Sequence, residues 1–140
     1  MVKVIDLLKD NTVVGYSAAP KDGSKPEVRA FMVLHIENRT IYFATGAGEK
    51  VCRQIEANPF IAFRTIEGTS KSVRVTGKAK FIDNVAVKSA LLRKNPSVMD
   101  IYGSGDNPEL KILYIKTATV EVFDMSVVPP RRERVDWTIP

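Results

Sequence analysis

The chain has 140 residues, of which 44% are hydrophobic and 26% are charged, so it is long enough to bury a sizeable core as one domain. Its eight glycines and eight prolines are scattered rather than clustered, which excludes a collagen-like, low-complexity or disordered chain. The longest unbroken apolar run, Ala30 to Leu34, is far shorter than the roughly 20 residues of a membrane-spanning helix. We expect a single domain over residues 1–140.

Two features of the sequence bear on the compartment. Asp6 interrupts the amino-terminal stretch where a secretory signal needs continuous hydrophobicity, so we do not expect export. Cys52 is the only cysteine, and a lone cysteine cannot form a disulfide within the chain, which agrees with a reducing environment. The cytoplasm is the expected location.

The formal net charge of +5 is concentrated in the middle of the chain. Residues 28–82 contain nine basic and four acidic residues, whereas the segments before and after them are close to balance. A basic surplus attracts phosphate, whether on a nucleic acid, a membrane surface or a nucleotide-like cofactor. Net charge alone does not distinguish these three ligands, so the distinction rests on the residue pattern.

The first part of the chain predicts a short helix followed by three strands. Apolar residues at helical spacing predict a helix over residues 2–10. A strand is predicted over 13–18. Two further runs, 28–36 and 40–45, are rich in β-branched and aromatic residues and flank Glu37-Asn38-Arg39, which is typical of a β-hairpin.

The rest of the chain predicts two more helices, three more strands and a tail. The strand over 72–82 has the plainest pattern, because apolar and polar residues alternate along it. A helix after it can be capped by Asp83 or Asn84 and should stop near Asn95-Pro96. In chain order we predict a helix at 49–57, strands at 60–66 and 72–82, the capped helix, a strand at 111–123 and an irregular arm at 128–140.

Six strands joined mostly by short turns, with small peripheral helices, predict a mainly β fold. The expected architecture is a closed or partly closed six-stranded antiparallel barrel. The strand-helix alternation of a doubly wound nucleotide fold is absent, and the chain has no internal repeat.

The predicted hairpin and the helix after it suggest an anion site. Antiparallel pairing around the Glu37–Arg39 turn brings Arg29 alongside Gly46–Gly48, which precede the helix. A helix amino terminus offers unpaired backbone N–H groups and a partial positive charge. With Lys50 in the first turn and the Thr45 hydroxyl nearby, these groups suit a phosphate monoester.

Structural explanations exist for the same residues. Arg29 can pair with Glu27 or Glu49, Lys50 can be a solvated helix residue, and the glycines can serve a tight turn. The Gly-Ala-Gly sequence is neither a dinucleotide fingerprint nor a phosphate-binding P-loop, because the further glycine or the Gly-Lys-Ser/Thr is missing.

Three other features have both a functional and a structural explanation, and we favour the structural one in each case. His35, the only histidine, could donate a proton or ligate haem, but is expected to be a packed or solvent-tipped strand residue. Cys52 could have a lowered pKa, but is expected to be a small buried residue. A basic stripe of Arg74, Lys78 and Lys80 could touch nucleic acid, but lacks interleaved aromatic residues.

An ordered set of segments resembles a known family. The set consists of Val28-Arg29-Ala30-Phe31-Met32, Ile41-Tyr42-Phe43-Ala44-Thr45, Glu49-Lys50 with Gln54-Ile55 and Asn58-Pro59, and Val73-Arg74-Val75-Thr76-Gly77-Lys78-Ala79. In this order, over roughly residues 2–125, the chain is similar to the pyridoxamine 5'-phosphate oxidase-like, FMN-binding split-barrel superfamily. Its short length and the segment from Asn95-Pro96 to Tyr102 resemble the branch of small flavoproteins that includes nitroimidazole-resistance reductases.

The resemblance implies roles for individual residues. Arg29 and Lys50 would bind the FMN phosphate with help from Thr45, and the backbone of Ala30–Met32 would line the isoalloxazine ring. Ser72 matches a position where the oxidases carry a Gln that touches the flavin, so the resemblance implies that this contact is weakened or lost here. The implied cofactor-binding set is Arg29, Ala30, Phe31, Met32, Ala44, Thr45, Glu49, Lys50 and Ser72, with no metal ligand and no assigned catalytic residue.

The resemblance also sets expectations for substrate, partner and activity. Leu34 matches the substrate-binding Lys of the oxidases, and their Tyr, Arg and Ser cluster for the substrate phosphate has no counterpart, so pyridoxamine phosphate is not expected as substrate. Members are usually homodimers with FMN at the interface. Residues late in the chain, Tyr114 among them, would then complete the FMN site of the partner. A small nitroreductase-like oxidoreductase using a nicotinamide donor is the implied activity. Deazaflavin or haem in the same fold, a flavin store, and a nucleic-acid-binding barrel are the alternatives.

Overall fold

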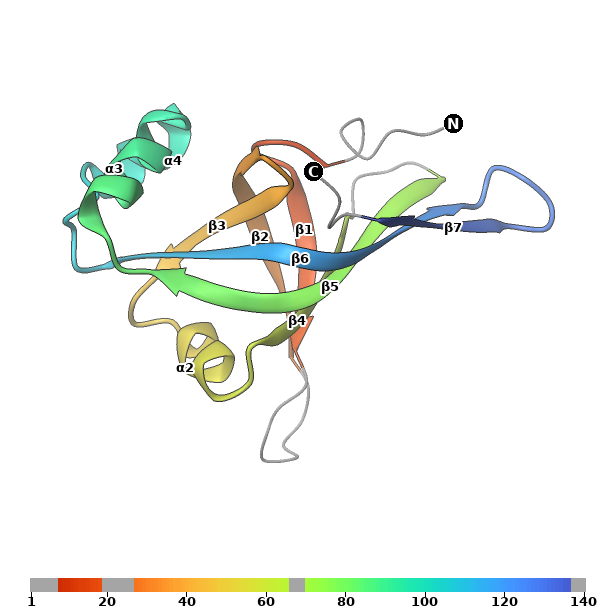
Figure 1. Ribbon diagram of the computed structural model, residues 1–140, viewed down its shortest axis with the longest axis horizontal. Helices are drawn as coiled ribbons and strands as arrows, with labels where there is room; N and C mark the ends of the chain where they lie inside the picture. Colours follow the sequence, from red (N-terminus) through yellow and green to blue (C-terminus); the bar gives the residue numbers. More distant parts are fainter. Residues whose placement is uncertain (1–7, 19–26, 66–69, 137–140) are drawn as a thin grey trace.

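The computed structural model describes residues 8–18, 27–65 and 70–136, and it contains a six-stranded antiparallel barrel with short helices outside it (Figure 1). The strands follow the order β3-β2-β1-β4-β5-β6, and a β3–β6 pairing closes the barrel. These strands are β1 (Val13–Ala18), β2 (Glu27–Glu37), β3 (Thr40–Gly46), β4 (Phe60–Thr65), β5 (Lys71–Ile82) and β6 (Leu110–Asp124). The predicted fold class is confirmed.

The longest strand, β6, holds three parts of the molecule together. It pairs with β3 over Leu110–Ile115 and with β5 over Ile112–Asp124. Its last residues also pair with β7 (Arg131–Asp136), which touches no other strand of the described sheet. The predicted irregular arm at 128–140 is therefore wrong for residues 131–136, which form a strand that extends beyond the barrel (Figure 1).

The barrel interior is filled by apolar side chains from alternating strand positions. The ring of Phe43 lies 5.7 Å from Phe31 and meets Phe63 edge to face at 5.1 Å between ring centroids, arrangements that stabilise aromatic packing. The alternation predicted for β5 is confirmed, because Val73 and Val75 are fully buried.

The side chains of β2 alternate between the barrel core and a second apolar layer. Phe31 and Val33 belong to the core, while Leu34 is fully buried in a separate cluster against which Met32 packs. Between Val33 and His35 the pairing of β2 with β3 shifts.

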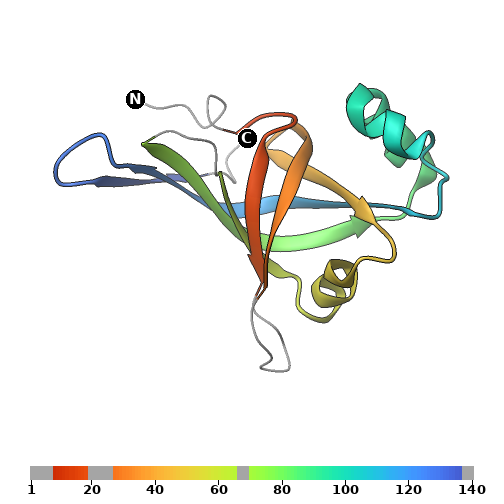
Figure 2. The same cartoon turned by 180° about the vertical axis from the view of Figure 1, so that it is seen from behind.

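Three short helices flank the barrel, at α2 (Lys50–Ala57), α3 (Val85–Arg93) and α4 (Pro96–Tyr102). The first two were predicted, and Asn84 caps α3 by accepting a hydrogen bond from the Val87 N–H at 3.1 Å. Asn95 caps α4 in the same way. Seen from behind, α3 and α4 lie at one end of the molecule and the β6–β7 hairpin at the other (Figure 2).

Two predictions for helices need correction. The structure adds α4 directly after the predicted stop at Asn95-Pro96, because proline is well tolerated at the first position of a helix. Of the predicted helix at 2–10, residues 2–7 lie outside the described residues, and residues 8–10 form a bend and a turn instead. Among the helices that the structure describes, none is long and apolar enough to cross a membrane.

Candidate functional site

The barrel is split where β2 and β3 separate. Their pairing ends at Val33 and Phe43, beyond which β2 stays with β1 and β3 stays with β6. The Val33 N–H donates to the Thr12 carbonyl of the β1 side at 2.9 Å. Since backbone groups alternate sides along a strand, those of Ala30 and Met32 point the other way, toward the gap between β2 and β3.

A cavity of about 400 Å³ occupies this gap. Its walls come from the start of β2, the end of β3, the first turn of α2 and the last residue of α4. The lining residues are Arg29, Ala30, Phe31, Met32, Ala44, Thr45, Gly46, Glu49, Val51 and Tyr102. Cavities of this size accommodate small molecules and cofactors, and seven of the nine predicted cofactor-binding residues line this one.

One part of the cavity carries groups that suit an anion. Arg29 lines it from β2. Its Nη2 atom donates to the Gln54 Oε1 atom of α2 at 3.4 Å, and its Nε atom is buried from solvent. Thr45 brings a hydroxyl that is buried with the side chain. The α2 terminus lies beside them. Its N-cap residue makes no side-chain capping bond, and the Cys52 N–H of the first turn donates to the Glu49 carbonyl at 3.1 Å.

Glu49 adds a negative charge to the same wall. It is the N-cap residue of α2, is exposed, and lines the cavity. A carboxylate is stabilised by the positive end of a helix, but it repels a second anion. The net attraction for phosphate therefore depends on Arg29 outweighing Glu49.

The other part of the cavity is mainly apolar. Met32 and Ala44 reach it from the two separated strands and also pack against the second apolar cluster. Tyr102 reaches it from α4 and packs against the same cluster. Burial raises the pKa of the Tyr102 hydroxyl, and the negative charge of Glu49 acts in the same direction. Sequence reasoning missed Tyr102 as a lining residue, because no local pattern shows where α4 packs.

Two predicted cofactor-binding residues lie outside the cavity lining. Lys50 is exposed as the first residue of α2, between Glu49 and Val51, which do line the cavity. Ser72 lies on β5, separated from β2 by β1 and β4, and its hydroxyl accepts a hydrogen bond from Arg64 at 3.0 Å. The roles of these two residues in cofactor binding stay predictions.

The structural explanations of His35 and Cys52 agree with their surroundings. His35 lies outside the cavity lining, with Nδ1 2.8 Å from the Asp10 carboxylate and Nε2 3.8 Å from that of Glu37. Cys52 is buried in the barrel core and donates its S–H to the Gly46 carbonyl at 3.4 Å. Burial raises the pKa of its thiol, so the reactive thiolate is disfavoured.

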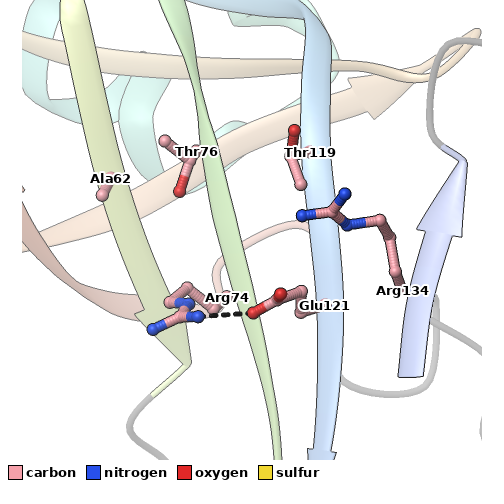
Figure 3. A pocket seen from close by; sticks show the side chains of 6 residues that line it. All are labelled: Ala62, Arg74, Thr76, Thr119, Glu121 and Arg134. Atoms are coloured by element: carbon pink, nitrogen blue, oxygen red, sulfur yellow. Dashed lines mark hydrogen bonds and ion pairs between the residues drawn. The ribbon is translucent and has the colours of Figure 1, made fainter. Parts of the chain in front are cut away.

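A second cavity, also of about 400 Å³, lies on the outer face of the sheet (Figure 3). Arg74 and Glu121 point toward each other there and form an ion pair at 2.5 Å, which holds the pKa of Glu121 below its usual range. The floor consists of small side chains that face one another across three strands, Ala62, Thr76 and Thr119. Arg134 also lines this cavity, so its lining carries two guanidinium groups and one carboxylate.

Comparison with known proteins places the whole barrel in one family. The family model described as pyridoxamine 5'-phosphate oxidase matches residues 3–124, which include every strand of the barrel. Among curated protein sequences, none matches the chain.

Solved structures share the fold at low sequence identity. A NimC/NimA family protein from Clostridium acetobutylicum is 20% identical with a TM-score of 0.76, over 94% of this chain and 91% of that one. A pyridoxamine 5'-phosphate oxidase-related, FMN-binding protein from Nostoc punctiforme is 12% identical with a TM-score of 0.72, over 90% and 81%. A haem-binding protein from Mycobacterium smegmatis is 12% identical with a TM-score of 0.68, over 91% and 54%. Similarity at this level shows the fold alone.

Proposed function

The chain belongs to the pyridoxamine 5'-phosphate oxidase family, and from this premise we propose that it is an FMN-binding flavoprotein acting as a small oxidoreductase. The cavity between β2 and β3 is the proposed FMN site. The FMN-binding protein from Nostoc punctiforme, which has the same fold, supports this choice of cofactor.

The observation that carries the proposal is the two-part character of the cavity. FMN joins a dianionic phosphate to a flat ring system whose edge bears polar atoms. Arg29 and Thr45 supply the groups for the phosphate, while Met32 and Ala44 supply an apolar surface for the ring. Between them, the backbone of Ala30 and Met32 faces the gap with hydrogen-bonding groups that a ring edge can use.

When bound, FMN supplies the electron or hydride transfer. In our proposal, the chain's own residues bind and orient it. Arg29 neutralises phosphate charge, and the Gln54 amide holds the guanidinium in place through the 3.4 Å hydrogen bond. Backbone groups that are fixed by the β1–β2 ladder hold the ring without any protein nucleophile. A nicotinamide donor and a small electron acceptor, as in nitroreductases, complete the proposed activity.

We do not propose pyridoxamine phosphate, the substrate of the oxidases proper, as the substrate of this protein. Leu34, which matches their substrate-binding Lys, is fully buried in the apolar layer under α3 and α4. A side chain in that position cannot contact a phosphorylated substrate in the cavity.

We further propose a homodimer in which each cavity is completed by the second copy. Ser72 cannot reach the cavity of its own chain, because two strands separate β5 from β2 on that side of the barrel. Any contact of Ser72 with flavin, which the resemblance implies is weakened or lost, would therefore be made in the partner's cavity. The resemblance also implies a place for Tyr114 in the partner's site. In its own chain the Tyr114 ring packs 6.1 Å from that of Tyr42, and Tyr114 does not line the cavity.

Haem is a weaker candidate for this cavity than FMN. The haem-binding protein from Mycobacterium smegmatis shares the fold, and histidine is a common iron ligand. The only histidine of this chain, His35, lies outside the lining and is engaged by Asp10. The cavity therefore offers no imidazole to an iron.

The direct test is to purify the protein and identify the bound chromophore by absorbance and mass. We expect FMN, and we expect Arg29→Ala and Lys50→Ala to lose it while remaining folded. Arg53→Ala is the matched control, because Arg53 is an exposed cation of α2 that, unlike Lys50, is not adjacent in sequence to a lining residue. A haem Soret band, a deazaflavin mass, or full retention of FMN by Arg29→Ala would contradict the proposal. Bound FMN that no nicotinamide reduces would indicate a flavin store.

A further inference from the structure

Tyr102 differs from every other lining residue in its origin. The other nine come from one continuous part of the chain, residues 29–51, whereas Tyr102 comes from the end of α4. It is also the one phenol among the described lining residues. The cavity is therefore closed on this side by an element that belongs to neither strand of the split.

The structure fixes α4 at both ends, so Tyr102 has a defined position. At the start, Asn95 is 1% exposed, caps the helix, and donates through Nδ2 to the Leu34 carbonyl at 2.9 Å. At the end, the Gly103 N–H donates to the Met99 carbonyl at 2.7 Å. The carbonyl of Tyr102 itself accepts from Asn107 Nδ2 at 2.9 Å. A side chain on such a fixed backbone is ready to meet a ligand without rearrangement.

The surroundings keep the Tyr102 hydroxyl neutral. Burial raises its pKa, and the nearby carboxylates of Glu49 and Glu109 raise it further. A neutral phenol is a hydrogen-bond donor that brings no charge into the apolar part of the cavity. Its ring packs against the same apolar cluster as Met32 and Ala44.

We propose that Tyr102 is a specificity-determining residue of the cavity. Its ring forms the wall of the apolar part, and its hydroxyl donates a hydrogen bond to an acceptor atom on the edge of a flat heteroaromatic ring. The inference rests on the proposed function in taking FMN as the ligand. It assigns Tyr102 to recognition of the ring rather than of the phosphate, because Tyr102 packs against the same apolar cluster as Met32 and Ala44.

The test compares FMN with riboflavin, which has the same ring and no phosphate. Calorimetric titration should show that Tyr102→Phe binds both about 2- to 10-fold more weakly, because one hydrogen bond is lost. Tyr102→Ala should lose a larger factor for both ligands, since the aromatic wall is also lost. The ratio of FMN to riboflavin affinity should stay at its wild-type value in both variants. Phe60→Ala is the control for the loss of an aromatic ring, because Phe60 is exposed and lies outside the lining.

Each outcome has a distinct meaning. If the wild type binds FMN and both Tyr102 variants bind it equally well, the inference is overturned and the proposed function stands. A change in the affinity ratio would also overturn it, because Tyr102 would then act on the phosphate. A wild-type protein that binds neither flavin would overturn the proposed function together with this inference. Far-ultraviolet circular dichroism checks that Tyr102→Ala is folded, and Tyr102→Phe keeps the packing ring in any case.

Discussion

At the scale of single residues, two opposite charges compete for the same cavity. Arg29 attracts a phosphate and Glu49 repels it, and both line the split between β2 and β3. Glu49 makes no side-chain capping bond to α2, so removing its charge costs the helix little. Affinity for an anion in this cavity is therefore limited by a carboxylate that the fold does not require.

We expect Glu49→Gln to bind FMN several-fold more tightly than the wild type, because one like charge near the phosphate is removed. Riboflavin affinity should barely change. Calorimetric titration at low and moderate salt measures both, and the gain should shrink as salt screens the charge. Glu56→Gln is the control, since Glu56 is exposed on α2 outside the lining. Unchanged or weaker FMN binding by Glu49→Gln would place the phosphate elsewhere.

At the residue level the sequence predicted which segments lie close together but not how they pair. Arg29 and Thr45 line the same cavity, as the hairpin indicated. The predicted pairing between their segments is wrong, because the β2–β3 ladder ends at Val33 and Phe43 and leaves a gap there. The position of Tyr102 could not be predicted, because it depends on how α4 packs on the barrel. Lys50 was predicted to bind the cofactor because of its place at the start of the helix. It is next to lining residues in sequence, but it is exposed and does not line the cavity.

At the scale of elements, the contact between α3 and the segment after α4 leaves no space at Gly105. A Cβ atom there would lie 2.2 Å from Ser89 Oγ, 2.5 Å from the Ser89 backbone nitrogen and 2.8 Å from the Val85 carbonyl oxygen. The last two are backbone atoms and cannot rotate away. This contact fixes the chain that follows Tyr102 against α3.

We expect Gly105→Ala to lower the free energy of unfolding by about 1–3 kcal/mol, as overpacked substitutions do. Urea denaturation of the cofactor-free protein measures the change in midpoint. Gly48→Ala is the matched control, because nothing lies within 4 Å of a Cβ added at Gly48, and its stability should be unchanged or slightly higher. Equal stability of the two variants would show that α3 is not tightly packed at Gly105.

Most elements could be predicted from the sequence, and the two elements that were missed, α4 and β7, have physical reasons. The barrel strands carry β-branched and aromatic residues, and α2 places Val51 and Ile55 on one buried face. In contrast, β7 begins Arg131-Arg132-Glu133-Arg134 and lacks an apolar face, so only its backbone pairing with β6 makes it a strand. The helix α4 starts with a proline that also ends the helix before it.

At the scale of the whole molecule, the barrel separates its cavity from Ser72. A cavity that needs Ser72 must obtain it from a second chain, so the proposed dimer makes a prediction about mixed assemblies. In a dimer of an Arg29→Ala chain with a Ser72→Trp chain, both changes would fall in one site and the other site would be intact.

We therefore expect mixing of these two variants, each deficient in FMN binding, to restore binding at up to one site per mixed dimer. Sedimentation velocity checks the dimers, and calorimetric titration after subunit exchange counts the restored sites. Ser70→Trp, at an exposed position just before β5, serves as the control for the added bulk. If each site belonged to one chain, mixing would restore nothing.

The central claim is that Arg29, at the split between β2 and β3, binds the phosphate of FMN. The most direct measurement is the ratio of FMN to riboflavin affinity in the wild type and in Arg29→Ala. We expect the wild type to prefer FMN by about 10- to 100-fold, the usual range for charge-assisted hydrogen bonds, and Arg29→Ala to bring the ratio close to one. A wild type that does not distinguish the two flavins, or an Arg29→Ala protein that distinguishes them as well as the wild type, would contradict the account.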